Sequence, residues 1–415
     1  MTDTSLFQQI TDYANRADPY PLYTELRKSP VHRDETGVYV VGGYHDILSL
    51  LHDPRISSDA RNRAEQPGGS ALPGEEDEGD GVLPPTFLRL DPPEHDRLRA
   101  ITNRPFGPPH SPRRIDGMRG ELRTIVTDLI DHLDGGDGTL DVVEQFSYPF
   151  PVTVICRLLG IPRADESRFH SWADTLVSTL DPRPDVDTAE RVRIAQQARL
   201  ELGMYLNALL DERRKKPGDD MLSHLVAGNA PEGRMSGMEV LATAALLLIA
   251  GHETTVNLIT NGMLTLLRHP EILERLREDP RLAVPLVEEL LRFEPPVQML
   301  PNRSPIADIE LHGVTVPKGS PLCLVVASGN RDPARFEDPD RFDPDRRDVQ
   351  HLGLGSGVHS CFGAPLARLE AQLALAELAR RLEAPRLLED PPPYRQNAVL
   401  RGPRHLRIAV DGVRP

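Results

Sequence analysis

The chain has 415 residues, of which 39% are hydrophobic and 5% aromatic, and it carries a net charge of −15. This length allows a large, mainly aliphatic core, and the acidic balance argues against a general binder of nucleic acid or anionic membranes. Its three cysteines, Cys156, Cys323 and Cys361, include no C-x-x-C pair. They therefore predict neither a disulfide framework nor a zinc site, and they fit a reducing cytoplasm.

The N-terminal residues show no basic segment followed by an apolar one, so no signal peptide is expected. The longest apolar run, residues 240–250, is far shorter than the ~20 residues of a membrane span. Residues 64–82 are rich in glycine and acidic side chains and predict a mobile acidic loop. No repeat or linker is visible. We expect a cytoplasmic, monomeric protein with one domain over residues 1–415 and no membrane contact.

Hydrophobic periodicity predicts helices through most of the chain and strands mainly near its end. A strand is expected at 38–41 and a helix at 44–51, ended by Asp53-Pro54. Further helices are expected at 120–133, 152–159, 191–213 and 372–382. A hairpin over 309–316 precedes a strand at 322–326, and a last strand is expected at 406–410. These elements predict a mainly α protein with small β-sheets.

A long helix is predicted where Ser236 and Glu239 fit a capping box, and it can continue to Arg268 before His269-Pro270. It would be about 45 Å long and must cross the interior. In its middle, Gly251 costs about 1 kcal/mol relative to alanine, and Thr254 can bond back to the carbonyl of Ala250. Such local departures are expected at functional sites. The alternative is a tolerated glycine beside solvated His252 and Glu253.

Cys361 lies between glycines in the segment 354–363, just before a helix in which Pro365 suits the first turn. Free N–H groups and the positive end of the helix dipole are expected to lower the pKa of its thiol. An isolated cysteine is more often a buried structural residue, but the glycines and the helix start favour a metal ligand here.

Two further patterns place charged side chains on one helix face. Glu289 and Arg292 are three residues apart and directly precede a helix end at Phe293-Glu294-Pro295. His95 and Arg99 are four residues apart, and Arg303 and His359 offer two further donors. Four such donors could bind two carboxylates of one ligand, although each residue taken alone is more often an ordinary surface residue.

Together these motifs resemble those of bacterial, actinobacterial-type cytochromes P-450, which are soluble haem-thiolate monooxygenases. The similarity runs from about Asp18 to Leu406 and includes the ordered motifs at 91–99, 250–255, 289–292, 330–342 and 354–363. The resemblance implies the cytochrome P-450 fold, a single domain with helix-rich and sheet-rich lobes around a buried haem b, iron protoporphyrin IX.

The resemblance also implies roles for individual residues. Cys361 would be the axial thiolate ligand of the iron, and Glu253 with Thr254 would deliver protons for oxygen activation. Residues in contact with the haem would be His95, Arg99, Ala250, Gly251, Arg303, His359 and Gly363. Glu289 and Arg292 would support the cysteine loop. The chain departs from the family at Leu354, where phenylalanine usually shields the sulfur, which puts the reduction potential and the iron–sulfur bond in question.

Substrate contacts implied by the resemblance are Phe87, the region 172–180, Leu246, Ile249, Val297, Met299, Leu300 and Val399. This apolar lining predicts a hydrophobic small molecule, such as a natural product of secondary metabolism, that is hydroxylated or epoxidised. The chain shows no flavin or iron–sulfur domain, so electrons are expected from a ferredoxin and an NAD(P)H-dependent ferredoxin reductase. The expected ferredoxin-docking cluster is Arg97, Arg99, Arg104, Arg113 and Arg114.

Three alternatives stay open from the sequence. The protein could be a haem-thiolate peroxygenase driven by hydrogen peroxide, against which the Glu253–Thr254 pair argues. It could be a non-catalytic haem protein. It could also be a thiol hydrolase that uses Cys361 and His359, although residues two apart on a tight loop rarely align as nucleophile and base.

Overall fold

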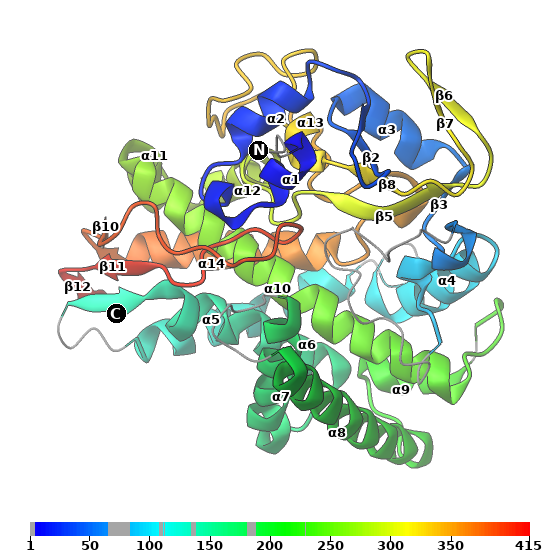
Figure 1. Cartoon of the computed structure of the whole chain (residues 1–415). Helices are drawn as coiled ribbons and strands as arrows, with labels where there is room; N and C mark the ends of the chain where they lie inside the picture. The colour runs from blue at the N-terminus through cyan, green and yellow to red at the C-terminus, as the bar shows by residue number, and fades with distance from the viewer. Residues whose placement is uncertain are drawn as a thin grey trace.

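Helices form most of the molecule, and the larger sheet lies at one side of it (Figure 1). The computed structural model describes residues 5–64, 84–107, 111, 113–133, 138–180, 188–228 and 230–415. Apart from residue 64, the predicted acidic loop 64–82 lies outside the described residues.

The described helices are α1 (Leu6–Thr11), α2 (Tyr20–Leu26), α3 (Tyr44–His52), α4 (Glu94–Phe106), α5 (Arg114–Asp131), α6 (Pro149–Leu159), α7 (Glu166–Leu180), α8 (Thr188–Lys215), α9 (Met221–Ala227), α10 (Gly237–Arg268), α11 (Pro270–Glu278), α12 (Ala283–Phe293), α13 (Val326–Gly329) and α14 (Ala364–Arg381). The short helices η3 (Phe87–Arg89) and η7 (Gly357–His359) lie near the site discussed below. Each helix predicted from periodicity is present, with its ends shifted by up to eight residues, the largest shift being the start of α14.

The described strands are β1 (His32–Arg33), β2 (Tyr39–Val41), β3 (Ile56–Ser57), β4 (Thr139–Asp141), β5 (Leu300–Pro305), β6 (Ile309–Leu311), β7 (Val314–Val316), β8 (Leu322–Leu324), β9 (Leu382–Glu383), β10 (Arg386–Leu387), β11 (Arg407–Ala409) and β12 (Gly412–Val413). The larger sheet has the order β1-β2-β8-β5-β3, in which β2 and β8 run parallel. It joins the N-terminal part of the chain to the segment before the cysteine loop.

The late strands follow the sequence closely. The predicted hairpin pairs β6 with β7, and both turn residues, His312 and Gly313, have positive φ angles, as a tight hairpin turn requires. Strand β8 ends two residues earlier than predicted because Val326 begins α13. The predicted C-terminal strand is β11, which pairs with β10 and β4.

Helix α10 passes through the middle of the molecule, between the sheet and the helices α7 and α8 (Figure 1). Its capping box is formed, with Ser236 accepting from the Glu239 N–H and Glu239 accepting from the Ser236 N–H. Among the described residues this helix alone is long and apolar enough to cross a membrane, but 67% of its most apolar window is buried inside the protein. It packs against α6 and α14 as the central element of the largest hydrophobic core.

Candidate active site

The loop that carries Cys361 is clamped between the ends of two helices. A Cβ on Gly353 would overlap the carbonyl oxygen of Leu291 in α12. A Cβ on Gly357, where φ is +67°, would overlap the carbonyl oxygen of Leu51 in α3. Only glycine allows these close approaches. The loop is closed by the Cys361 N–H, which donates to the Leu354 carbonyl at 2.8 Å.

Cys361 lies at the N-terminal end of α14, where the residue keeps accessible surface although many protein atoms surround its thiol. Desolvation raises its pKa, although the N–H groups of Gly363 and Ala364 and the charges of Arg99 and Arg368 act in the opposite direction. The sequence-based expectation of a lowered pKa was therefore wrong in its net direction. The stabilising donors are present, but the surrounding protein atoms outweigh them. A bound metal cation would supply the missing charge and hold the sulfur as thiolate.

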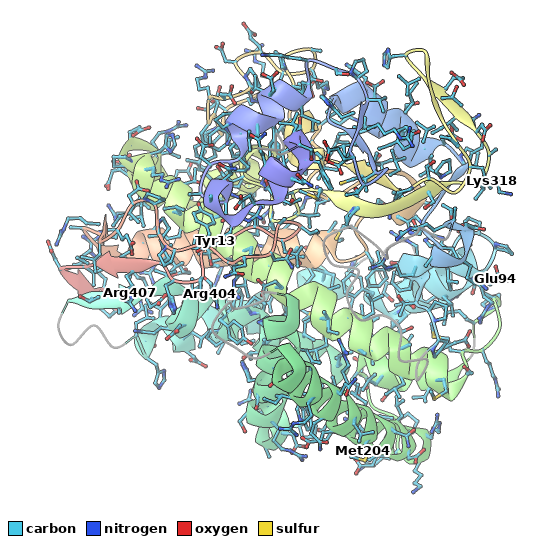
Figure 2. The ribbon with its side chains drawn as sticks, in the orientation of Figure 1. Tyr13, Glu94, Met204, Lys318, Arg404 and Arg407 are labelled. Atoms are coloured by element: carbon cyan, nitrogen blue, oxygen red, sulfur yellow. The ribbon has the colours of Figure 1, made fainter. Side chains whose placement is uncertain are left out.

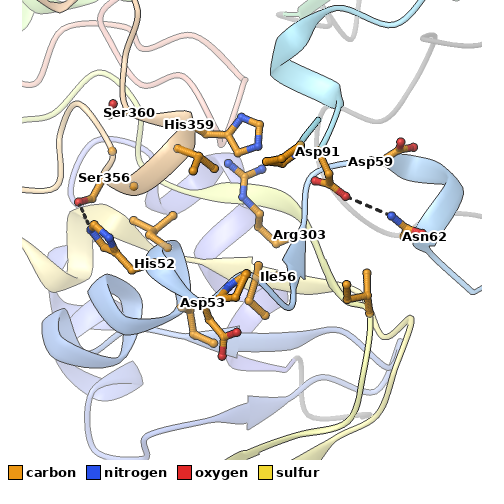
Figure 3. A pocket seen from close by; sticks show the side chains of 18 of the residues that line it. His52, Asp53, Ile56, Asp59, Asn62, Asp91, Arg303, Ser356, His359 and Ser360 are labelled. Atoms are coloured by element: carbon orange, nitrogen blue, oxygen red, sulfur yellow. Dashed lines mark hydrogen bonds between the residues drawn. The ribbon is translucent and has the colours of Figure 1, made fainter. Parts of the chain in front are cut away.

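The four donors predicted to hold carboxylates come together beside this loop. The rings of His95 and His359 lie 4.5 Å apart, and Arg99 donates to the carbonyl of Ser360 at 2.6 Å. Figure 3 shows the Arg303 side chain directed at His359. Burial, and then the charges of Arg303, His95 and Arg99, lower the pKa of His359 to about 3.

Two ring nitrogens in this group, His95 Nε2 and His359 Nδ1, are buried without a hydrogen-bond partner among the described residues. Burial lowers the pKa of Arg303 to about 10. Donors concentrated in this way fit a ligand that brings two carboxylates, as the propionates of a haem do. The neutral His359 and the raised pKa of Cys361 also argue against an imidazolium–thiolate pair for hydrolysis.

A cavity of about 1490 Å³ extends from these donors to the surface. Its inner wall includes Arg303 and His359, and its outer rim includes Glu94 and Lys318. Figure 2 shows Glu94 and Lys318 at the same edge of the molecule, with Lys318 on the side of the larger sheet and Glu94 below it in this view. On the rim side, Asn62 donates to Asp91 at 3.1 Å (Figure 3). The cavity therefore connects the carboxylate-binding donors with solvent.

One stripe of residues in the middle of α10 keeps accessible surface. Leu246 and Thr254 are partly exposed and Ala250, between them, is exposed, although most of the helix is buried. The Thr254 hydroxyl donates to the Ala250 carbonyl at 2.8 Å, as predicted. Gly251 has a different environment, since a Cβ there would lie 2.8 Å from Ile155 of α6. Its small size permits the close packing of α6 on α10.

Glu253 lies on another side of α10 from this stripe and is only 3% exposed. Its Oε1 lies 3.1 Å from Nε of Arg395 and accepts a hydrogen bond from Asn257 at 3.2 Å. Burial lowers the pKa of His252 to about 3, and that ring packs edge-on against Tyr148. The alternative of a solvated His252 and Glu253 is therefore wrong. Arg395 was not predicted, because no motif marks its segment.

Glu289 and Arg292 form a fully buried ion pair at 2.7 Å, and their side chains are 1% and 0% exposed. Arg292 also donates to the carbonyl oxygens of Asn330, Pro339 and Arg341 at 2.7 to 3.0 Å. The Asn330 side chain in turn accepts from the Leu352 N–H at 2.7 Å, just before the cysteine loop. The pair thus supports that loop through a continuous hydrogen-bond network.

A second buried network was missed from the sequence. Glu294 contacts both Arg331, at 3.1 Å, and Arg401. Burial alone would raise the pKa of Glu294, but the two guanidinium groups lower it below its usual value. Arg331 also stacks over the ring of Tyr20 at 3.4 Å. The network connects α2, the end of α12 and the C-terminal segment. The only signal for it in the sequence is a charged residue, Glu294, at a predicted helix end.

The predicted substrate contacts divide among several clusters. Phe87 and Leu246 share a cluster with Leu98 and with Phe362, the residue after Cys361. This places the middle of α10 next to the cysteine loop. Others border different cores: Ile249 the main core, Met299 and Val399 the core around α2, and Leu300 the core around α3. Val297 pairs with Leu400 through a β-bridge.

Comparison with known proteins agrees with this geometry. The family model described as Cytochrome P450 matches residues 87–410. The chain is 41% identical to the cytochrome P450 monooxygenase PikC of Streptomyces venezuelae, covering 94% of this chain and 91% of that protein. It is 34% identical to the 6-deoxyerythronolide B hydroxylase of Saccharopolyspora erythraea, covering 95% and 96%.

Solved structures give the same result. Cytochrome P450 CYP109Q5 from Chondromyces apiculatus superposes with a TM-score of 0.85 at 33% identity, covering 97% of this chain and 98% of that one. The cytochrome P450 PksS of the bacillaene polyketide synthase of Bacillus subtilis 168 has a TM-score of 0.85 at 32% identity, covering 97% and 99%. The chain belongs to the bacterial cytochrome P450 family and is a haem-thiolate monooxygenase.

Proposed function

We propose that this monooxygenase holds haem b through Cys361 and inserts one oxygen atom into a hydrophobic natural product. The carrying observation is the group of His95, Arg99, Arg303 and His359 beside the cysteine loop, with two buried ring nitrogens that have no hydrogen-bond partner among the described residues. Two propionates would accept hydrogen bonds from this group of donors. Ala250 and Gly363 would border the ring plane, from α10 and from the start of α14.

The bound haem supplies electron storage and the activation of dioxygen. The side chains of the protein would orient the substrate, exclude water and transfer protons. The stripe of Leu246, Ala250 and Thr254 would orient an apolar substrate and exclude water from the reacting carbon. The Thr254 hydroxyl, released from the Ala250 carbonyl, would donate a hydrogen bond where oxygen is activated. Glu253 would replace the proton that Thr254 gives up, as a general acid does.

The substrate class rests on the apolar residues expected to contact the substrate and on the names of two relatives. Among the relatives are a vitamin D(3) 25-hydroxylase of Pseudonocardia autotrophica, at 37% identity, and the 6-deoxyerythronolide B hydroxylase. The two names state hydroxylation of vitamin D(3) and of 6-deoxyerythronolide B. We therefore infer a macrolide-like or steroid-like substrate for this chain, bound against Phe87 and the exposed stripe of α10.

A spectral and isotopic experiment tests this function. Vitamin D3, 6-deoxyerythronolide B and corticosterone are added separately to the ferric protein, and a high-spin shift is expected with at least one. Turnover of that compound under labelled dioxygen should give a product with one labelled oxygen atom. Product formed with hydrogen peroxide alone, at the rate seen with NADPH and redox proteins, would instead support a peroxygenase. A low-spin spectrum that no such compound changes would favour a non-catalytic haem protein.

The proposed electron donors are a ferredoxin and its NAD(P)H-dependent reductase in the cytoplasm, acting on a monomer. Three of the five predicted docking arginines are ion-paired: Arg97 with Glu239, Arg104 with Glu232 at 3.0 Å, and Arg114 with Asp219 at 3.1 Å. Arg99 points inward to Ser360. The positive potential of this face is thus weaker than the sequence suggests, and Arg113 becomes its most informative residue.

A further inference from the structure

The Glu253 carboxylate is buried where α10 meets the C-terminal segment, residues 394–403. Its contacts include Arg395 Nε, at 3.1 Å, and Asn257 Nδ2, at 3.2 Å, and the Arg395 side chain is 10% exposed. Thr254, the next residue along α10, directs its hydroxyl to the Ala250 carbonyl instead. The acid and the alcohol of the relay therefore lie on different sides of the helix, and the acid faces the C-terminal segment.

The segment that carries Arg395 is held rigidly against this side of α10. The Arg395 N–H donates to the Gly402 carbonyl at 3.1 Å, and Tyr394 pairs with Pro403 through a β-bridge. A Cβ on Gly402 would overlap the Asn257 side chain, so only glycine lets the segment approach this closely. The guanidinium is thus presented to Glu253 by a constrained turn.

The charges around Glu253 single out Arg395. His252 precedes Glu253 on α10 and is also buried, but it is neutral because burial holds its pKa at about 3. His170, on α7, is also shifted toward its neutral form by burial, which lowers its pKa. A buried carboxylate needs a cation or several donors to remain ionised. Arg395 meets that need from outside the helix, and its side chain is 10% exposed.

We propose that Arg395 is a positioning residue for proton delivery, and that protons reach Thr254 from the side of α10 covered by residues 394–403. This inference rests on the proposed function, because it deepens the role of Glu253. In each delivery the Glu253 carboxylate leaves Arg395, takes one proton from a water molecule, and gives it to the Thr254 hydroxyl oxygen to replace the proton that Thr254 has given up. A proton from bulk solvent neutralises the hydroxide left by that water molecule, and the carboxylate returns to Arg395. No electron moves in this step.

The test uses the haem-loaded enzyme with ferredoxin, ferredoxin reductase and NADPH, without any added organic compound, so the substrate need not be known. Hydrogen peroxide formed per NADPH is measured for the parent, Arg395→Met, Arg395→Lys, Glu253→Gln and the double variant Glu253→Gln/Arg395→Met. Slower proton delivery favours release of peroxide over its further reduction to water. Arg386→Met is the matched control, because Arg386 is a surface arginine of the C-terminal region paired with Asp411.

We expect Arg395→Met to raise the peroxide fraction several-fold and to increase the solvent deuterium isotope effect on NADPH oxidation, while Arg395→Lys and Arg386→Met stay near the parent. In the Glu253→Gln background, Arg395→Met should add no further change. A parent-like Arg395→Met, or effects of the two substitutions that simply multiply, would overturn the inference. A purely structural role would leave the solvent isotope effect unchanged, even where the thermal unfolding midpoint falls.

A second readout does not depend on turnover. In the ferric protein, Glu253→Gln and Arg395→Met should lower the unfolding midpoint by amounts that are not additive in the double variant, because each breaks the same ion pair. Additive shifts would show that the two side chains are not coupled, against the inference. Failure of the proposed function is recognised separately: without haem-thiolate ligation the parent would lack the thiolate-ligated carbon-monoxide spectrum, and without monooxygenase turnover no labelled oxygen would enter any added compound.

Discussion

Two buried carboxylate–guanidinium pairs in this enzyme differ in how firmly they are held. Arg292 binds Glu289 through both Nε and Nη2 and also donates to three backbone carbonyls. Arg395 approaches Glu253 through Nε. The first pair is built to stay closed and to shape the loop around Cys361. In the second pair the arginine makes fewer hydrogen bonds, and the pair stands beside the turn of α10 where we propose that oxygen is activated and a moving carboxylate is useful.

The largest effect is expected at the first pair. Arg292→Lys removes the planar fork that satisfies Glu289 and the carbonyls, which should cost about 3–5 kcal/mol of unfolding free energy. Haem content and denaturant unfolding are measured together. Glu377→Gln is the control, since Glu377 and Arg380 have the same spacing in an exposed pair, and it should stay within ~0.5 kcal/mol of the parent. Equal losses of unfolding free energy in the two variants would show that the buried pair contributes no more to stability than the surface pair.

At the second region, Thr254→Ala should lower product formation by roughly 10²-fold, because the helix loses the hydroxyl that we propose as a proton donor. Peroxide per NADPH should rise, with haem content and unfolding midpoint close to those of the parent, since the Thr254 hydroxyl bonds only to its own helix. The assay is product and peroxide per NADPH with the compound that gives the largest spin shift. Parent-like coupling would contradict the relay.

Leu354 offers a smaller test on the cysteine-loop side. Its carbonyl accepts the Cys361 N–H, and its side chain packs on the edge of the main core. Leu354→Phe adds apolar cover over the sulfur, which excludes water and changes the solvation of the thiolate. We expect a shifted haem reduction potential and a longer-lived thiolate-ligated carbon-monoxide complex. Identical potentials and lifetimes would show that leucine already shields the sulfur fully.

The smallest effect is expected at the surface. Arg113→Glu should weaken ferredoxin-driven turnover, and Arg104→Glu should do so less, because Arg104 is already neutralised by Glu232. The difference from the parent should shrink as salt is added, since exposed charges are screened. Initial rates are compared at low and high ionic strength. Effects independent of salt would place the docking face elsewhere.

The sequence predicted the elements that depend on local pattern. The capping box at Ser236, the hairpin turn at Gly313 and the glycine-framed cysteine loop were all read correctly, because each has a fixed spacing. The networks around Glu294 and Arg395 could not be predicted, since their partners are brought together only by tertiary packing of the C-terminal segment. The pKa of Cys361 was predicted wrongly for the same reason. The sequence shows the local N–H donors that lower this pKa, but it does not show the burial by residues distant in sequence that raises it.

The central claim is that the Cys361 thiolate is the haem ligand, and the reduced carbon-monoxide difference spectrum tests it most directly. The haem-loaded parent should show the red-shifted band of thiolate ligation, and Cys361→Ser should lose that band, while Cys156→Ser, a change at a buried cysteine elsewhere in the core, should keep it. A Cys361→Ser protein with the parent's band would contradict the account.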